Sequence, residues 1–176
     1  GKTTLLRLMM GLIKPDEGEV DDIPRSIAAV FQEDRLPNEF TPYVCVKMTA
    51  PHGVSRETIL SHLAEVGLAD SVNKPVSQLS GGMRRRVAIA RALVNDPEIL
   101  LADEPTGALD SDTSVQVMDL LREVAKDRLV VMVTHNPELA EQYATRIVNL
   151  KDGKIRSDTD EYIVEEENLA PPEHKN

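Results

Sequence analysis

The chain has 176 residues, of which 41% are hydrophobic, so it is long enough to bury one core as one domain, or as a domain with a small lobe. Its formal net charge of −10 and its aromatic content of only 3%, without tryptophan, argue against a broad nucleic-acid-binding surface. The single cysteine, Cys45, excludes an internal disulfide and indicates a reducing compartment, and no apolar run approaches the roughly 20 residues that cross a bilayer.

The first element is a helical pattern over residues 3–11 that follows directly on the letters GKTT. These letters match the end of the phosphate-loop pattern G-x-x-x-x-G-K-[ST], in which amides at a helix N-terminus face an anion. The candidate phosphate ligands are Gly1, Lys2, Thr3 and Thr4, and the Thr3 hydroxyl is also a candidate Mg²⁺ ligand. Taken alone, GKTT is a weak signal, because Gly-Lys-Thr occurs by chance on many surfaces, and the alternative is a frayed N-terminus.

The remaining elements alternate between strands and helices, which is typical of an α/β fold. We expect strands at 18–20 (short at most), 26–32, 98–103 and 129–134, helices at 55–68, 80–94, 113–126 and 138–144, and a hairpin at 146–155 turned at Asp152-Gly153. Residues 33–54 are expected to be irregular because Pro37, Pro42 and Pro51 interrupt them. Residues 157–176 are acidic and are expected to form a tail or linker.

The stretch LSGGMRRR precedes the expected helix at 80–94 and contains Ser80, Gly81 and Gly82. Small residues with free amides allow close approach to an anion, although a capped helix with a flexible start explains them equally well. The three arginines that follow, at 84–86, predict a solvated face or a face between lobes.

Two acids follow the apolar run EILLA, which has the composition of a fully covered parallel strand. They are Asp103 and Glu104, and they would lie at the carboxyl edge of the sheet, where α/β proteins bind ligands. A division of labour fits this pair: Asp103 holds Mg²⁺, and Glu104 polarises an attacking water. The alternative is an acidic pair that caps a helix.

Together these motifs resemble one family, the ATP-binding cassette (ABC) transporter ATPases. LSGG followed about twenty residues later by LLADEPTGALD is specific to it, as are Gln32 after the strand AVFQ and His135 after the strand VMVTH. The motif order also matches, and the similarity covers residues 1–156. It implies a P-loop NTPase-like, mostly parallel sheet flanked by helices, with a small helical subdomain at about 33–94 that contains the signature helix.

The resemblance also implies roles for single residues. Glu104 would be the catalytic carboxylate, His135 the γ-phosphate sensor, and Gln32 a contact to Mg²⁺ and the attacking water. Asp103 would be a metal ligand. Asp110 would belong to a loop that crosses between subunits, and Ser80, Gly81 and Gly82 would contact a nucleotide held by the opposite subunit. The implied cofactors are ATP and Mg²⁺.

The implied protein is an ATPase subunit or domain that works beside a membrane permease on the inner, cytoplasmic face of the membrane, as a homodimer or with a paired second ABC domain. The back half resembles lipoprotein-release and macrolide-export cassettes, whereas VFQEDRL and LSGGMRRR resemble nitrate, sulfonate and taurine importers, so the resemblance supports import and export alike. A cassette ATPase of DNA repair or translation and a catalytically inert fragment are the alternatives. No nucleic-acid partner is expected.

The family pattern also contains a strand, the start of the phosphate loop and an adenine-stacking aromatic residue that this sequence does not show. We therefore expect an N-terminally truncated cassette whose first central strand, beside the strand ending in Asp103, is missing. On this interpretation the 176-residue chain by itself is inactive.

Overall fold

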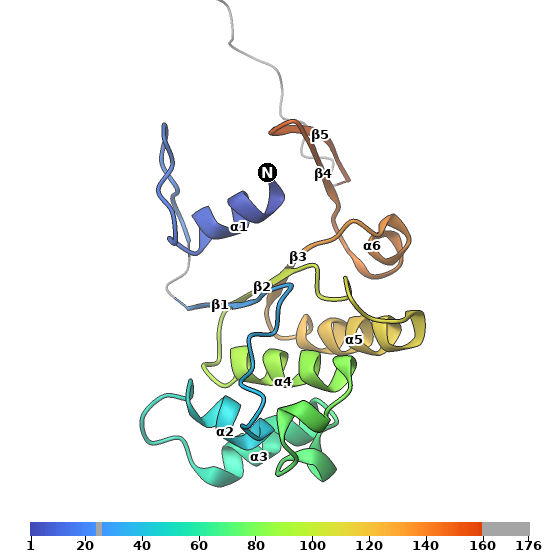
Figure 1. Cartoon of the computed structure of the whole chain (residues 1–176). Coiled ribbons are helices and arrows are strands. Elements are labelled where there is room, and N and C mark those ends of the chain that lie inside the picture. The colour runs from blue at the N-terminus through green and yellow to red at the C-terminus, as the bar shows by residue number, and fades with distance from the viewer. Residues whose placement is uncertain (24–25, 160–176) are drawn as a thin grey trace, which may run out of the picture.

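The computed structural model describes residues 1–23 and 26–159, and its centre is a parallel sheet of three strands (Figure 1). The strands run in the order β1 (Ile27–Val30), β2 (Ile99–Asp103) and β3 (Leu129–Val133), in a register that pairs the first residues of all three. Every residue of β2 is buried, because this strand has a neighbour on each side and helices over both faces. The predicted α/β class with a parallel sheet is confirmed.

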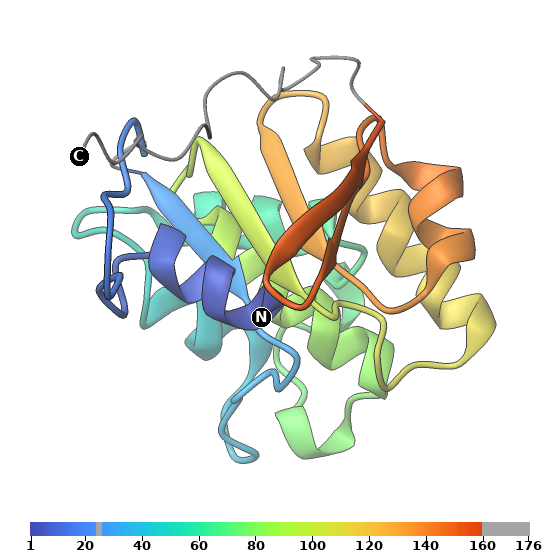
Figure 2. The ribbon, with the colours of Figure 1, turned by 90° about the horizontal axis from the view of Figure 1, so that it is seen from above.

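Helices form layers on both faces of this sheet. The helices are α1 (Lys2–Met9), α2 (Pro42–Lys47), α3 (Arg56–Glu65), α4 (Gly81–Leu93), α5 (Ser111–Val124) and α6 (Pro137–Tyr143), with 3₁₀ turns η1 (Ala69–Ser71) and η2 (Val76–Gln78). Figures 1 and 2 show α1 on one face of the sheet and α4 and α5 on the other, with α2 and α3 beyond α4. The segment 33–94, where a helical subdomain is expected, thus contains α2, α3 and α4, and α2 and α3 lie on the side of α4 that faces away from the sheet.

The alternation of side chains along β2 divides the core between these layers. Leu100 joins the large cluster formed with α3, α4 and α5, whereas Ile99 and Leu101 pack with Leu6 of α1 in a second cluster. Because successive strand residues point to opposite faces, one continuous apolar run supplies both cores.

One of the three prolines in the segment 33–54, Pro42, acts differently from our prediction. Pro42 does not break an element but begins α2, where Thr41 is the N-cap and its side chain accepts a hydrogen bond from the Val44 amide at 3.3 Å. The first helical position suits proline because no intrahelical partner is needed there for an amide hydrogen. The short strand expected at 18–20 is absent from the described residues of that segment.

A second, two-stranded sheet lies at the end of the described chain. It pairs β4 (Val148–Lys151) with β5 (Lys154–Asp158) in antiparallel fashion, and the positive φ angles of Asp152 (53°) and Gly153 (75°) form the expected tight turn. The strand β5 runs two residues beyond the expected boundary at 156, and the rest of the expected tail lies outside the described residues.

The position expected for a missing strand is wrong. β2 is hydrogen-bonded to β1 on one side and to β3 on the other, so no further strand can pair with the strand that ends in Asp103. Within the three-stranded sheet of the described residues, β1 and β3 are the edge strands with one neighbour each.

Candidate functional site

The start of α1 lies against the carboxyl end of β2. The Thr3 hydroxyl donates a hydrogen bond to Asp103 Oδ1 over 3.2 Å, across a sequence separation of 100 residues. The packing of Leu6 on the same face of β2 as Leu101 holds the helix in this place. The helix start that is expected to bind phosphate therefore lies next to the carboxylate that is expected to bind a metal, at one edge of the sheet.

Glu104 and His135 face each other at the same edge. Glu104 has a left-handed backbone (φ 48°), and its amide donates to the Val133 carbonyl of β3 at 2.9 Å. The carboxylate is 14% exposed; Oε1 lies 3.4 Å from His135 Nε2, and the His135 amide donates to Oε2 at 3.4 Å. Oε1 accepts no hydrogen bond from the described residues, although it is buried. A buried carboxylate oxygen without a donor favours a ligand or water at this point.

An open cavity of about 900 Å³ joins these groups. Its lining includes the following predicted site residues: Gly1, Lys2, Thr3, Thr4, Gln32, Glu104 and His135. Asp103 is not part of the lining; it is 8% exposed and reaches the cavity edge through its bond to the Thr3 hydroxyl. The volume suits a ligand of nucleotide size, and the lining is polar where the phosphates of such a ligand would lie.

Four predicted site residues lie away from this cavity. Ser80 and Asp110 are the N-caps of α4 and α5: the Ser80 hydroxyl accepts from the Met83 amide at 3.2 Å, and Asp110 accepts from the Thr113 amide at 2.9 Å and from its hydroxyl at 2.7 Å. These bonds from Thr113 lower the pKa of the Asp110 carboxyl. Gly81 and Gly82 lie in the first turn of α4, next to Leu109 and Thr113 at the start of α5.

Gly82 has a packing role that the sequence pattern did not indicate. A Cβ at this position would lie 2.2 Å from Thr113 Cγ2, so the glycine permits α4 and α5 to approach closely. The small side chain at position 82 therefore has a reason in the packing of α4 against α5, in addition to any approach of a ligand.

Sequence reasoning missed several residues of the site. Thr106, Gly107 and Asn136 also line the cavity, directly after the acidic pair and the histidine. Their signal was their place in the loops at the carboxyl ends of β2 and β3, where the ligands of parallel sheets bind.

Arg85 is only 2% exposed, which excludes the solvated face for this residue and leaves the other expectation for the arginines at 84–86, a face between lobes. Its signal was periodicity: together with Ala88, Ile89 and Ala92 it follows the i, i+3, i+4, i+7 pattern of a buried helix face.

A parallel α/β sheet that brings a phosphate-type helix start, two acids and a histidine to one carboxyl edge is typical of proteins that bind nucleoside triphosphates. The chain belongs to the ABC transporter family, whose model matches residues 1–107.

Similar proteins include importers and exporters. An aliphatic sulfonates import ATP-binding protein, SsuB 2 of Frankia alni, is 42% identical over 157 residues, which are 88% of this chain and 63% of that protein. A macrolide export ATP-binding/permease protein, MacB 1 of Yersinia pestis, is 36% identical over 90% of this chain and 28% of its own length. The chain thus spans under two thirds of these relatives.

A solved structure shows the same fold. The dimeric ATP-binding cassette MJ0796, in a post-hydrolysis state bound to ADP and Pi, superposes with a TM-score of 0.74 at 36% identity, over 90% of this chain and 79% of that one. The resemblance to an ABC cassette, with similarity to both import and export types, is confirmed. Among the helices described, none has the length and apolar character that crossing a membrane requires.

Proposed function

We propose that this chain forms part of the ATP-binding and ATP-hydrolysing domain of an ABC transporter. The observation that carries the proposal is the hydrogen bond from Thr3 to Asp103 at the edge of a cavity that Glu104 and His135 also line. The phosphate-type helix start and the acidic pair lie about 100 residues apart in the sequence, and they are neighbours in the fold.

The residues of the cavity divide the chemistry. Lys2 and the amides of the first turn of α1 bind the phosphates, because a helix N-terminus carries partial positive charge. Glu104 accepts a proton from the attacking water. The His135 amide donates to Glu104 Oε2, the His135 ring lies 3.4 Å from Oε1 at the position proposed to sense the γ-phosphate, and Gln32 orients the water from the cavity lining.

The oxygen ligands at the edge of the cavity fit Mg²⁺. The Thr3 hydroxyl and the Asp103 carboxylate are 3.2 Å apart, and the Gln32 amide lies on the same cavity. Hydroxyl and carboxylate oxygens are the donors that this hard cation prefers. When bound, Mg²⁺ neutralises negative charge on the phosphates.

Ser80, Gly81, Gly82 and Asp110 complete the site of a second copy in this proposal. They lie outside the cavity of their own chain, at the adjacent starts of α4 and α5, and the MJ0796 cassette is dimeric. ATP then joins two half-sites, and its hydrolysis releases them. The name of the macrolide exporter, an ATP-binding/permease protein, supports a permease as the membrane partner, and we place the chain beside it at the inner face of the membrane.

The test replaces the proposed general base in the full-length gene product. Glu104→Gln is expected to lower the ATP turnover number at least about a hundredfold, because the amide cannot take a proton, while MgATP-dependent dimerisation persists. Turnover is measured by phosphate release and dimerisation by size-exclusion chromatography. The matched control is Glu141→Gln in α6, an exposed carboxylate outside the cavity, which should turn over like the wild type.

Two results would contradict the proposal. A wild-type product without MgATP turnover would overturn the assigned activity, and a Glu104→Gln variant with undiminished turnover would remove Glu104 from its role.

A further inference from the structure

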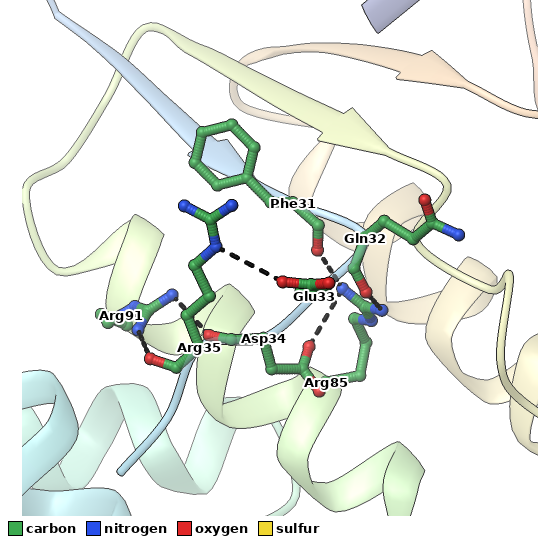
Figure 3. A network of polar contacts seen from close by, with 7 residues as sticks. All are labelled: Phe31, Gln32, Glu33, Asp34, Arg35, Arg85 and Arg91. Carbon is green, nitrogen blue, oxygen red and sulfur yellow. Dashed lines mark hydrogen bonds and ion pairs between the residues drawn. The ribbon is translucent and has the colours of Figure 1, made fainter.

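The loop that carries Gln32 leaves the sheet at the end of β1 and is held by side chains of α4 (Figure 3). The Arg85 guanidinium donates to the Phe31 carbonyl at 2.5 Å and to the Gln32 carbonyl at 2.7 Å, and its Nη1 lies 3.0 Å from Asp34 Oδ1. Past the end of the strand these carbonyls lack a sheet partner, so a buried side chain takes the place of the neighbouring strand.

A second arginine of α4 secures the other end of the loop. Arg91 donates to the Asp34 carbonyl at 3.0 Å and to the Arg35 carbonyl at 3.3 Å (Figure 3). Arg85 and Arg91 lie six residues apart on α4, so the segment 31–35 is fixed to this helix at both ends.

Burial makes the Arg85 contacts costly to lose. The Arg85 side chain is 3% exposed and the Asp34 side chain 19%. Burial lowers the pKa of the Arg85 guanidinium, which the Asp34 charge counteracts; burial also raises the pKa of Asp34, against the effect of Arg85. Removing one partner of such a pair leaves the other charged and desolvated, so the geometry of the loop is strongly tied to Arg85.

We propose that Arg85 is a positioning residue for ATP hydrolysis: its hydrogen bond to the Gln32 carbonyl fixes the backbone from which the Gln32 side chain enters the nucleotide cavity. The position of the Gln32 side chain then depends on the position of α4. The inference rests on the proposed function. It adds a link between Ser80 and Gln32, because Ser80 is the N-cap of α4, and Arg85, five residues further along the same helix, donates a hydrogen bond to the Gln32 carbonyl. A shift of α4 that moves Ser80 then also moves Gln32 relative to Glu104.

The alternative is that Arg85 only stabilises the attachment of the lobe to the sheet. The two roles differ in whether the effect of Arg85 passes through Gln32. A double-mutant cycle between the two positions measures this directly.

The experiment compares Arg85→Gln, Gln32→Ala and the double variant in the full-length gene product. Arg85→Gln should lower kcat about ten- to hundredfold, since small misplacements of a reacting group have effects of this size, and should change the KM for ATP less than about threefold. The double variant should be no slower than Gln32→Ala. Arg85→Lys should restore activity only in part, because one ammonium cannot span two carbonyls and a carboxylate.

The matched control is Arg86→Gln, the same change one residue later. Arg86 donates to the Gln116 side chain of α5, 3.2 Å away, and has no hydrogen bond to the loop, so kcat should stay within about twofold. If Arg85→Gln does not fold, as judged by thermal melting, Arg85→Lys carries the same comparison.

A readout independent of activity separates this inference from the proposed function. Hydrogen exchange of a peptide spanning 31–35 should be faster in Arg85→Gln, and in Arg85→Lys to a smaller extent, than in Arg86→Gln. Unchanged exchange, a multiplicative loss in the double variant, or a raised KM at unchanged kcat would overturn the positioning role. A wild-type product that shows no hydrolysis overturns the proposed function instead, and the reaction role of Arg85 with it.

Discussion

At the scale of the residue, one neighbouring methyl group, Cγ2 of Thr113, leaves no room for a side chain at Gly82. Its missing Cβ would lie 2.2 Å from Thr113 Cγ2, and Thr113 is itself fixed by its hydroxyl bond to Asp110. Gly82→Ala is therefore expected to lower the free energy of unfolding by about 1–3 kcal/mol, the usual effect of overpacking. Chemical denaturation measures it.

The control for this prediction removes the methyl group of Thr113 that an alanine at position 82 would meet. Thr113→Ser deletes Cγ2 and keeps the hydroxyl bond to Asp110, so the double variant Gly82→Ala/Thr113→Ser should recover most of the lost stability. Equal destabilisation of the single and double variants would show that the close approach to Thr113 is not the cause.

The positions of some single residues can be predicted from the sequence, and those of others cannot. Asp103, Glu104 and His135 are predictable because each follows an apolar strand, and the carboxyl ends of parallel strands share one edge. For the three arginines at 84–86 the sequence left open a solvated face or a face between lobes, because such a run is typical of solvated surface, and it did not show which arginine is buried. The buried role of the middle arginine depends on carbonyls of a loop more than 50 residues earlier in the chain.

At the scale of the element, α3 and α4 both begin with a serine N-cap. The Ser55 hydroxyl accepts from the Thr58 amide at 3.1 Å, and the Ser80 hydroxyl accepts from the Met83 amide at 3.2 Å. Ser55→Ala and Ser80→Ala should each lower the free energy of unfolding by about 1 kcal/mol, because each exposes an unpaired amide at a helix start.

Only one of these caps is expected to affect activity. Ser80→Ala should reduce ATP turnover of the full-length product, because Ser80 is also proposed to contact the nucleotide of the opposite copy, whereas Ser55→Ala should not. Equal effects of the two variants on turnover would mean that Ser80 acts only as a cap.

Elements were predictable where periodicity was long. The helices α3, α4 and α5 and the strands β2 and β3 lie where the apolar pattern placed them. The six-residue helix α2 was missed because it is too short for a periodic signal, and Pro42 is a breaker or a first helical residue depending on what precedes it.

At the scale of the whole molecule, a composite site between two copies predicts complementation. Ser80→Asp retains an N-cap but adds a carboxylate where the phosphate of the opposite copy is proposed to lie. A mixture of this variant with Glu104→Gln forms dimers in which one site has both defects and the other has none. Two variants that are inactive separately should recover up to about a quarter of wild-type turnover when mixed, since half of the dimers are mixed and half of their sites are intact.

The mixing result depends on which chain supplies each half of the site. Titration of one variant into the other, followed by phosphate release, should give a maximum near equal amounts. Turnover that equals the sum of the separate variants at every ratio would exclude a site shared between copies.

The sequence by itself determined the class of fold and the identity of the chemical groups. Strand and helix periods are local, and the motif residues follow directly on them, so both can be predicted without a model. Only the tertiary structure decided which groups meet: the Thr3–Asp103 contact, the neighbours of β2 on both sides, and the burial of Arg85 beneath the Gln32 loop. These contacts depend on strand order and helix packing between segments far apart in the chain, and a local period, such as that of the buried face of α4, does not tell which distant segment it meets.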